Sequence, residues 1–223
     1  MSNIKLVSLH IPKTAGTSFY KTIQDAYGIT SVARLDIKPN INKILLNTIE
    51  YNDTFLPDEI EVIHGHFNVL DLYEKYPETK DLPMITWLRD PVTRVISNYF
   101  YLQERLTTFL SNHENNRAIL DKMMKSIEEF IATDINRNKM SRFLIGKNLS
   151  DFKFVGLIEY YEEDLQSLSN LLNIQFNQNQ VNVTANDNKY DVSSDIIELI
   201  KQYNQEDIAL YEEAISIRNK RLS

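Results

Sequence analysis

The order of hydrophobic and polar residues near the N-terminus predicts a strand, a turn and a helix. Residues 4–11 are apolar and rich in β-branched side chains, and apolar or aromatic residues recur three and four positions apart between residues 17 and 27. Pro12 separates the two patterns, and Gly28 follows the second one. We therefore expect a buried strand that leads through a tight turn into an amphipathic helix.

A second unit of the same kind lies in the middle of the chain. Two apolar segments, EIEVIHGH at residues 59–66 and PMITWLR at residues 83–89, are typical of buried strands. Pro91 follows the second segment, and the first turn of a helix tolerates proline. The next residues, VTRVISNYFYLQERL, repeat apolar side chains three and four positions apart, which predicts a long helix.

The remaining half of the chain has mainly helical patterns. Residues 115–146 predict two helices with charged faces, and Gly146 has the position of a C-cap. Residues 151–172 predict a short strand followed by an amphipathic helix. Residues 177–194 are polar without a helical period and predict a loop, after which residues 194–217 predict either one terminal helix or two.

Strands that alternate with helices are typical of an α/β fold with a mostly parallel sheet covered by helices on both faces. A chain of 223 residues with 43% hydrophobic residues is long enough to bury a full core. We expect a single domain over residues 1–223 with a helical C-terminal part. Because ligands of such sheets bind beyond the carboxyl ends of the strands, the turns at residues 12–18 and 89–91 are expected to form two halves of one site.

Composition narrows the functional classes. The net charge of −7 argues against nucleic acid or an anionic membrane surface as a partner, so any anion site must be a local concentration of positive groups. The absence of cysteine excludes disulfides, thiolate zinc sites and cysteine nucleophiles, and is compatible with a reducing compartment. The sequence has no signal-peptide pattern and no apolar run of about 20 residues. We expect a cytoplasmic protein without a membrane span.

The turn PKTAGTS has the chemistry of a phosphate or sulfate cradle. Ala15 and Gly16 let the backbone approach a ligand, and the free N–H groups at the start of the following helix favour an anion. Thr17 and Ser18 add hydroxyl groups, and Lys13 adds a positive charge. The alternative interpretation is an ordinary turn with a threonine or serine cap.

The same turn differs from the loop of nucleotide triphosphatases. Its lysine precedes the glycine, and the usual first glycine is absent. The candidate strand end TWLRD presents arginine before its aspartate, so we find no clear acidic residue to hold magnesium. We therefore expect a site that requires no metal.

The segment WLRDPVTRVISNY suggests a second anion site. Arg89 stands at a strand end and Ser97 lies about two helical turns later, so the two residues converge only if the chain bends back across the turn. A guanidinium and a hydroxyl are suited to clamp a phosphate monoester. Arg89 and Asp90 are equally typical of a salt bridge that closes a turn. Arg94 is either a helix-surface arginine or a further ligand.

The motifs HIPKTAGTS, HGHF, LRDPVTRVISNY and FVGLIE, in this order, resemble the sulfotransferase family that uses 3′-phosphoadenosine 5′-phosphosulfate (PAPS). Within it they resemble the carbohydrate branch of heparan sulfate and uronyl 2-O-sulfotransferases. The resemblance extends from residue 6 to about residue 172 and implies a P-loop-like three-layer fold. It implies that the first loop binds the 5′-phosphosulfate and that the second motif binds the 3′-phosphate. The first role then falls on Lys13, Thr14, Ala15, Gly16, Thr17 and Ser18, and the second on Arg89 and Ser97.

The segment IHGHF places His64 and His66 on the same side of an extended strand end. Two histidines are too few for a catalytic zinc site, and a purely structural role is also open. A neutral histidine is suited to take the proton of an attacking hydroxyl. The resemblance implies that His66 is the base and that His64 holds the acceptor, with His64 as the fallback base. We expect His10 to shape the first loop and His113 to lie on the solvated surface.

These observations combine into the hypothesis of a PAPS-dependent O-sulfotransferase. The acceptor oxygen attacks sulfur in line, His66 removes its proton, and Lys13 stabilises the departing phosphate. The expected acceptor bears a hydroxyl and is a saccharide, a glycolipid precursor or another small metabolite. We also consider that the loop around Lys189 closes over the nucleotide.

Residues for the acceptor are less clear from the sequence. Relatives that modify anionic polysaccharides need basic residues along the acceptor groove. The densest run in this chain consists of Arg137, Lys139, Arg142, Lys147 and Lys153. The segment NRNKMSRF resembles the N-x-x-(T/S)-R segment of the family, which implies Asn138 and Arg142 as site candidates, although it is also typical of a solvated helix face.

Two other functional classes remain open. The first is a nucleotide or small-molecule kinase with a degenerate phosphate loop, which would require magnesium and bind adenosine triphosphate. The second is a non-catalytic phosphonucleotide-binding module, whose ligand binding would be accompanied by no turnover that depends on His66. Neither class accounts for the second motif and HGHF as well as a sulfotransferase does.

Overall fold

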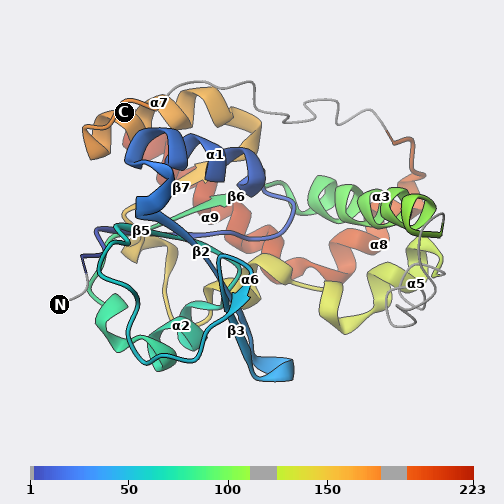
Figure 1. Ribbon diagram of the computed structural model, residues 1–223. Coiled ribbons are helices and arrows are strands. Elements are labelled where there is room, and N and C mark those ends of the chain that lie inside the picture. The colour runs from blue at the N-terminus through green and yellow to red at the C-terminus, as the bar shows by residue number, and fades with distance from the viewer. Residues whose placement is uncertain (1–2, 111–124, 177–189) are drawn as a thin grey trace.

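The computed structural model describes residues 3–110, 125–176 and 190–223. Its centre is a seven-stranded sheet with the order β4-β3-β2-β5-β1-β6-β7 (Figure 1). Five strands pair in parallel, namely β2 (Val32–Lys38), β5 (Val62–Gly65), β1 (Leu6–Leu9), β6 (Met84–Leu88) and β7 (Phe154–Leu157). The strands β3 (Lys43–Leu46) and β4 (Ile49–Glu50) continue the sheet in antiparallel orientation. The predicted mostly parallel sheet is confirmed.

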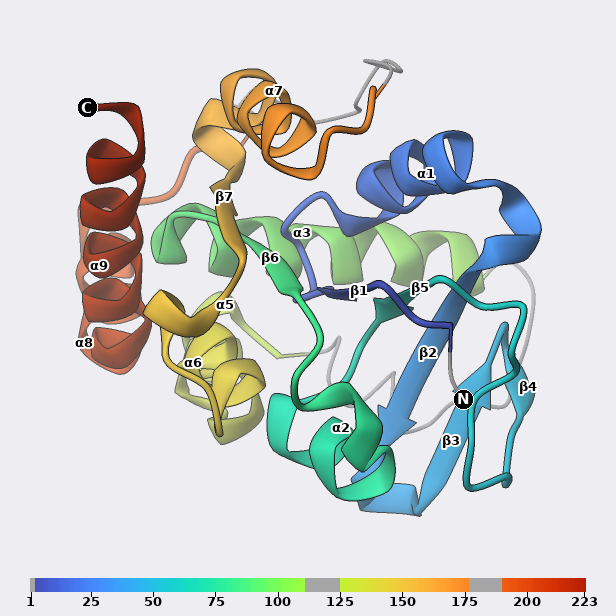
Figure 2. The same ribbon diagram turned by 90° about the vertical axis from the view of Figure 1, so that its left-hand side faces the viewer.

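Helices cover both faces of the sheet (Figure 2). The helices α1 (Gly16–Tyr27) and α7 (Tyr161–Leu172) pack on one face, and their apolar residues share a core with the strands. The other face carries α2 (Val69–Lys75), α6 (Lys139–Leu144) and α9 (Gln205–Leu222). Every residue of β1, β5, β6 and β7 is buried, as expected for parallel strands between two helical layers.

A third group of helices lies beside the sheet. It consists of α3 (Pro91–Leu110), α5 (Ile127–Ala132) and α8 (Ser194–Tyr203), which appear together on the right of Figure 1. Their contact is an apolar cluster around Val95, Phe130 and Ile200. This cluster fixes the position of α3, which begins directly after β6 at the edge of the sheet where ligands are expected.

The predicted strand and helix units are present, with shorter strands than the apolar segments suggested. The C-terminal segment forms two helices, because Asn204 leaves the helical conformation between α8 and α9. Gly146 has a φ of 98° and follows the end of α6 at Leu144, where a left-handed residue ends a helix. Parts of the predicted helices at residues 115–146 and of the loop at residues 177–194 lie outside the described residues.

The strands β2, β3 and β4 and the helix α2 were not predicted. The segment of β2 alternates apolar and charged residues, with Arg34 and Asp36 between Ala33, Leu35 and Ile37. Such a pattern of period two indicates a strand. Alternation places both charged side chains on one face of β2. Its next residues turn back into β3 and extend the sheet. Among the described residues, no helix is both long and apolar enough to span a bilayer.

Candidate active site

The turn between β1 and α1 is held in an unusual backbone conformation. Lys13 and Ala15 have φ values of 73° and 54°, in the left-handed region that residues with side chains adopt rarely. The helix α1 starts at Gly16 without a side-chain cap and without an acidic residue in its first turn. The N-terminal N–H groups and the positive end of the helix dipole are therefore available to an anion.

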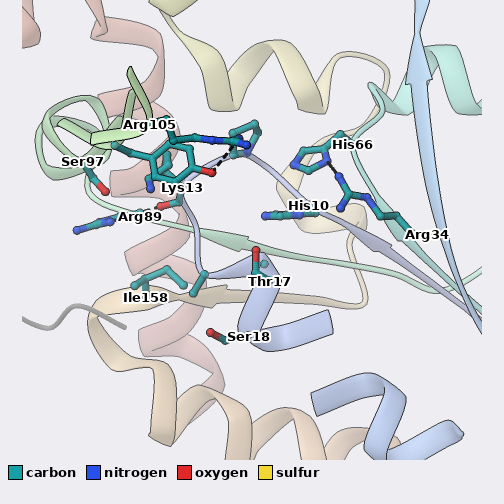
Figure 3. Close-up of a pocket in the computed structure, with 14 residues that line it drawn as sticks. His10, Lys13, Thr17, Ser18, Arg34, His66, Arg89, Ser97, Arg105 and Ile158 are labelled. Carbon is teal, nitrogen blue, oxygen red and sulfur yellow. Dashed lines mark hydrogen bonds between the residues drawn. The ribbon is translucent and has the colours of Figure 1, made fainter. Parts of the chain in front are cut away.

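A cavity of about 540 Å³ lies in front of this turn (Figure 3). We call it the first cavity. It is bounded by residues that follow the carboxyl ends of β1, β5, β6 and β7, together with one side chain of β2 and three side chains of α3. The lining residues are His10, Pro12, Lys13, Ala15, Gly16, Thr17, Ser18, Arg34, His66, Arg89, Ser97, Tyr101, Arg105 and Ile158. Four of these described residues are lysine or arginine and none is acidic.

The structure brings the two predicted anion motifs to the first cavity. Arg89 donates from Nε to Thr93 Oγ1 over 3.2 Å, and one terminal nitrogen lies 3.5 Å from the carbonyl oxygen of Lys13. Ser97 lines the same cavity from α3. Asp90 accepts a hydrogen bond of 2.8 Å from the backbone N–H of Thr93 and so caps the start of α3. The convergence that the sequence required of Arg89 and Ser97 is therefore present.

The side chain of Lys13 is half-buried beside other cations. Its Nζ atom lies 3.8 Å from the centre of the Tyr101 ring, in a cation–π arrangement. Burial, and then the positive charge of Arg89, lowers the pKa of Lys13 to about 8. The lysine is thus poised to gain from the arrival of a negative group.

Tyr101 and Arg105 also line the first cavity, although the sequence analysis did not single them out. Arg105 donates a hydrogen bond of 3.2 Å to the hydroxyl of Tyr101. Together with Ser97, these residues lie four positions apart, which places them on one face of α3. That spacing is the signal in the sequence that would have found them.

His66 lies just beyond the end of β5, on the opposite side of the first cavity from Lys13 and Arg89 (Figure 3). Its Nδ1 atom is 3.0 Å from Asp36 Oδ1, and its backbone N–H donates to the same oxygen over 3.1 Å. Arg34 donates to the other carboxylate oxygen of Asp36 over 3.0 Å. Asp36 therefore orients the ring of His66.

The contact with Asp36 selects a tautomer of this histidine. Burial alone would raise the pKa of Asp36, but the hydrogen bonds and charge of His66, with a further contribution from Arg34, lower it to about 2. The Nδ1 atom of His66 also lies 3.5 Å from a terminal nitrogen of Arg34, which can only donate. Because the contact with Asp36 is shorter and the ionised carboxylate can only accept, we assign a proton to Nδ1. In the neutral ring, Nε2 then carries the lone pair that a base needs.

His10 and His64 belong to the same cluster of imidazoles, in which His64 is buried and His10 also lines the first cavity. The ring centre of His10 lies 4.2 Å from that of His66 and 5.0 Å from that of His64. The pKa of His64 is lowered to about 3 by burial, and further by the charges of His66 and Arg34. Burial and the two other histidines also lower the pKa of His10 well below its ordinary value. Both rings are therefore neutral at physiological pH.

A second cavity of about 560 Å³ adjoins the first, and we call it the second cavity. It lies between the carboxyl end of β2, the turn that follows β2, and α6. Its lining residues are Arg34, Asp36, Ile37, Lys38, Pro39, Asn40, Ile41, His66, Phe67, Asn68, Ile135, Lys139, Arg142 and Phe143. Arg34 and His66 line both cavities, so His66 lies at their junction. In the described ranges, no cluster of three or more His, Asp or Glu side chains is arranged to hold a metal ion.

The model of the sulfotransferase family matches residues 2–212. The chain belongs to the sulfotransferase family. Two solved sulfotransferases are similar in structure. The enzyme from Alicyclobacillus acidocaldarius is 16% identical, with a TM-score of 0.50 and 97% of each chain covered. Mouse sulfotransferase SULT7A1 complexed with PAP is 12% identical, with a TM-score of 0.43, and the match covers 90% of this chain and 63% of the mouse chain. A search of curated proteins gave no match.

At 16% identity the likeness to the Alicyclobacillus enzyme shows the fold alone, and it agrees with the α/β architecture of this sulfotransferase. The sheet with helices on both faces is the architecture that the motifs implied. The family and the fold class that the sequence analysis inferred are both confirmed.

Several predicted site residues of the sulfotransferase lie away from the cavity walls. Thr14 is 1% exposed, and its hydroxyl donates to the carbonyl oxygen of Ile11 over 2.8 Å, so its side chain holds the turn together. His64 is 3% exposed and its Nδ1 atom is hydrogen-bonded to Ser8 Oγ at 2.9 Å. The structure therefore does not bring His64 to the position of an acceptor contact.

Of the two acceptor candidates on or beside α6, one lines a cavity and the other does not. Arg142 lines the second cavity. Asn138 does not line either cavity, and its side-chain oxygen accepts a hydrogen bond from the backbone N–H of Asp207 over 3.4 Å. The interpretation of Arg94 as a helix-surface arginine is wrong, because it is 1% exposed and its NH2 atom lies 3.8 Å from Asp207 Oδ2. The predictions for His113 and Lys189 concern positions outside the described residues.

Proposed function

We propose that this sulfotransferase moves the sulfuryl group of PAPS to a hydroxyl group of a carbohydrate or another small acceptor. The observation that carries the proposal is the position of His66. It lies at the junction of a cation-lined cavity and a second cavity, and Asp36 holds its Nδ1 atom. A base is useful at that junction because a donor on one side and an acceptor on the other would meet there.

The first cavity suits a phosphorylated nucleotide. Its described lining has four cationic side chains and no acidic one, so two separate anionic groups can be neutralised without a metal ion. The start of α1 and Lys13 are suited to the 5′-phosphosulfate, with Thr17 and Ser18 as hydroxyl donors. Arg89 and Ser97 are suited to the 3′-phosphate.

Gly16 supports this assignment. The ring of His10 occupies the place where a side chain at residue 16 would begin, with atoms 1.9 Å from an ideal Cβ position. A residue with a side chain could not keep this close approach between the turn and the imidazole cluster. The start of α1 and His66 thus line one cavity, and the ring of His10 lies close to both.

PAPS, when bound, supplies a sulfuryl group attached to a phosphate that can leave. His66 takes the proton of the acceptor hydroxyl at Nε2 while the oxygen–sulfur bond to the acceptor forms and the bond from sulfur to the phosphate oxygen breaks. Asp36 stabilises the imidazolium that results. Lys13 and the N–H groups of α1 stabilise the charge that builds on the departing phosphate, at roughly 3 kcal/mol for each well-placed donor.

The first test is calorimetric titration with 3′-phosphoadenosine 5′-phosphate (PAP), with adenosine monophosphate, and with adenosine triphosphate plus magnesium. We expect PAP to bind with micromolar affinity, independently of magnesium. Arg89→Ala should weaken PAP binding about tenfold to a hundredfold, because a charge-assisted clamp on the 3′-phosphate is lost. Lys75→Ala, which removes a lysine of α2 that lines neither cavity, is the matched control and should leave the affinity unchanged.

Transfer from PAPS to a panel of glycosides then tests the base. His66→Ala should lower turnover by about 10²–10⁴-fold while it leaves PAP affinity within about twofold. Magnesium-dependent binding of adenosine triphosphate without PAP binding would instead favour the kinase. PAP binding without any turnover that depends on His66 would favour the non-catalytic module.

A further inference from the structure

The second cavity is positively charged on a protein that is negatively charged as a whole. Among its described lining residues, the four cations Arg34, Lys38, Lys139 and Arg142 face a single acid, Asp36. The net charge of the chain is −7. Such a local reversal of charge attracts an anion to the cavity.

The charges in the cavity are not all used by the protein itself. Asp36 is occupied by Arg34 and by His66. Lys38 and Arg142 are exposed, and neither forms an ion pair with another residue in the described part of the chain. These two exposed lining cations are thus available to a ligand of the second cavity.

The second cavity also has an apolar wall. Ile37, Phe67 and Phe143 line its depth, and Ile41 and Ile135 line it with side chains that are 60% and 37% exposed. Exposed apolar side chains that gather at one cavity are typical of binding surfaces, because a ligand that covers them removes a contiguous apolar area from water. A purely hydrophilic ligand would leave this wall without a contact.

We propose that the second cavity takes an amphiphilic anion as acceptor: a molecule with a hydroxyl group, a negative group and an apolar group. This inference rests on the proposed function, because His66 must meet the hydroxyl at the junction of the cavities. The negative group contacts Arg142 and Lys38 or Lys139, and the apolar group covers Ile41 and Ile135. A volume of about 560 Å³ suits a molecule of one or two rings.

Three model glycosides separate the two features of the acceptor. 4-Nitrophenyl β-D-glucuronide carries both a carboxylate and an apolar ring. 4-Nitrophenyl β-D-glucoside lacks the charge, and methyl β-D-glucuronide lacks the ring. Each is titrated calorimetrically into the full chain saturated with PAP. We expect the first compound to bind about tenfold more tightly than either of the others, a difference of about 1.4 kcal/mol, because each of the others lacks one of the two contacts.

Charge reversal at Arg142 tests whether the negative group of the acceptor binds in the second cavity. Arg142→Glu should remove the advantage of the glucuronide over the glucoside. Lys153 belongs to the same basic run and is exposed, but it does not line the cavity, so Lys153→Glu should keep the advantage of the glucuronide. Arg142 is exposed, so neither variant is expected to lose the fold, and PAP binding by each confirms that the first cavity is intact.

Three results would overturn the inference. Equal affinity for the glucoside and the glucuronide would contradict recognition of a negative group. Equal affinity for the methyl and nitrophenyl glucuronides would contradict recognition of an apolar group. Absence of binding by all three compounds, with PAP bound normally, would show that the cavity does not take this class. Failure of PAP itself to bind would be the failure of the proposed function, and the PAP titration detects that separately.

Discussion

At the level of single residues, the surroundings of Lys13 destabilise its protonated form, and a bound anion would stabilise it. Burial, followed by the nearby Arg89, lowers its pKa to about 8, so near pH 8 about half of the free protein carries a neutral lysine. A bound phosphosulfate or phosphate favours the protonated form and raises the pKa again. Under the proposed function, the affinity for PAP is therefore coupled to a proton.

We predict that PAP binding takes up about half a proton at pH 8 and that its affinity falls as the pH rises further, by up to about tenfold per unit. Titrations at pH 8 in two buffers with different ionisation enthalpies measure the uptake directly. Lys13→Arg should keep PAP binding and abolish the uptake, because arginine stays charged. Equal proton uptake in the wild type and in Lys13→Arg would contradict the assignment.

Gly16 is the residue at which the smallest change should matter most. In Gly16→Ala, the new methyl group would collide with the ring of His10, whose atoms lie 1.9 Å from the ideal Cβ position. His10 packs on His66, so we expect weaker PAP binding, by about tenfold or more, together with lower turnover. Ala15→Gly is the matched control. It relaxes a residue with a φ of 54° and should preserve the affinity, whereas equal behaviour of the two variants would argue against the steric explanation.

The sequence predicted part of this site and missed the rest for a physical reason. Lys13, Arg89 and His66 belong to local motifs, and the residue types in each motif indicate its chemistry. Arg34 and Asp36 stand on a strand that was overlooked in a polar region, although the alternating pattern was present. The partner of His66 is set by which strands are neighbours, and β2 lies beside β5 only in the folded sheet.

At the level of elements, a buried acid joins three helices. Asp207, at the start of α9, is fully buried and accepts hydrogen bonds from the backbone N–H groups of Met140 and Ser141 at the start of α6. It also lies 3.8 Å from Arg94 of α3. Because α6 carries Arg142 and α3 carries Ser97, this link positions elements of both cavities.

Asp207→Ala should therefore lower the free energy of unfolding by about 3 kcal/mol or more, because it leaves the buried charge of Arg94 without its ion-pair partner and the N–H groups of α6 without their acceptor. Urea unfolding followed by circular dichroism measures the loss. Glu206→Ala, at an exposed neighbouring position, should change it by no more than about 0.5 kcal/mol. Similar losses in both variants would show that the carboxylate has no special role.

Individual strand, turn and helix units were predictable because prolines and changes of period mark their ends. The order of the strands and the burial of Arg94 were not predictable. Arg94 has the spacing of a surface residue within α3, and its partner Asp207 lies far along the chain in α9. Contacts of this kind depend on how elements pack and leave no signal in the local pattern.

For the whole molecule, the notable feature is the separation of charge. Seven of the chain's 24 lysine and arginine residues line the two cavities within the described residues, compared with one of its 31 acidic residues. The other acidic residues of the described ranges line neither cavity, so the cavities are cationic on an anionic molecule. Nucleotide binding should therefore be governed by local rather than net charge.

We predict that the affinity for PAP falls by about tenfold or more between roughly 50 mM and 500 mM potassium chloride, because salt screens its contacts with the cationic lining. Parallel titrations at several salt concentrations give the slope. Arg105→Gln should make the slope shallower, while the exposed control Lys153→Gln should not. An affinity that does not change with salt would mean that the cations of the first cavity contribute little.

Among the residues that the structure describes, the two cavities share only Arg34 and His66, and their remaining walls come from different parts of the chain. The donor side depends on the turn after β1 and on α3, whereas the turn Pro39–Ile41 and α6 shape the other side. Evolution can therefore lengthen or rewrite the turn between β2 and β3 without disturbing the transfer chemistry. Exchange of that turn among related enzymes offers a route to redirect sulfation to new molecules.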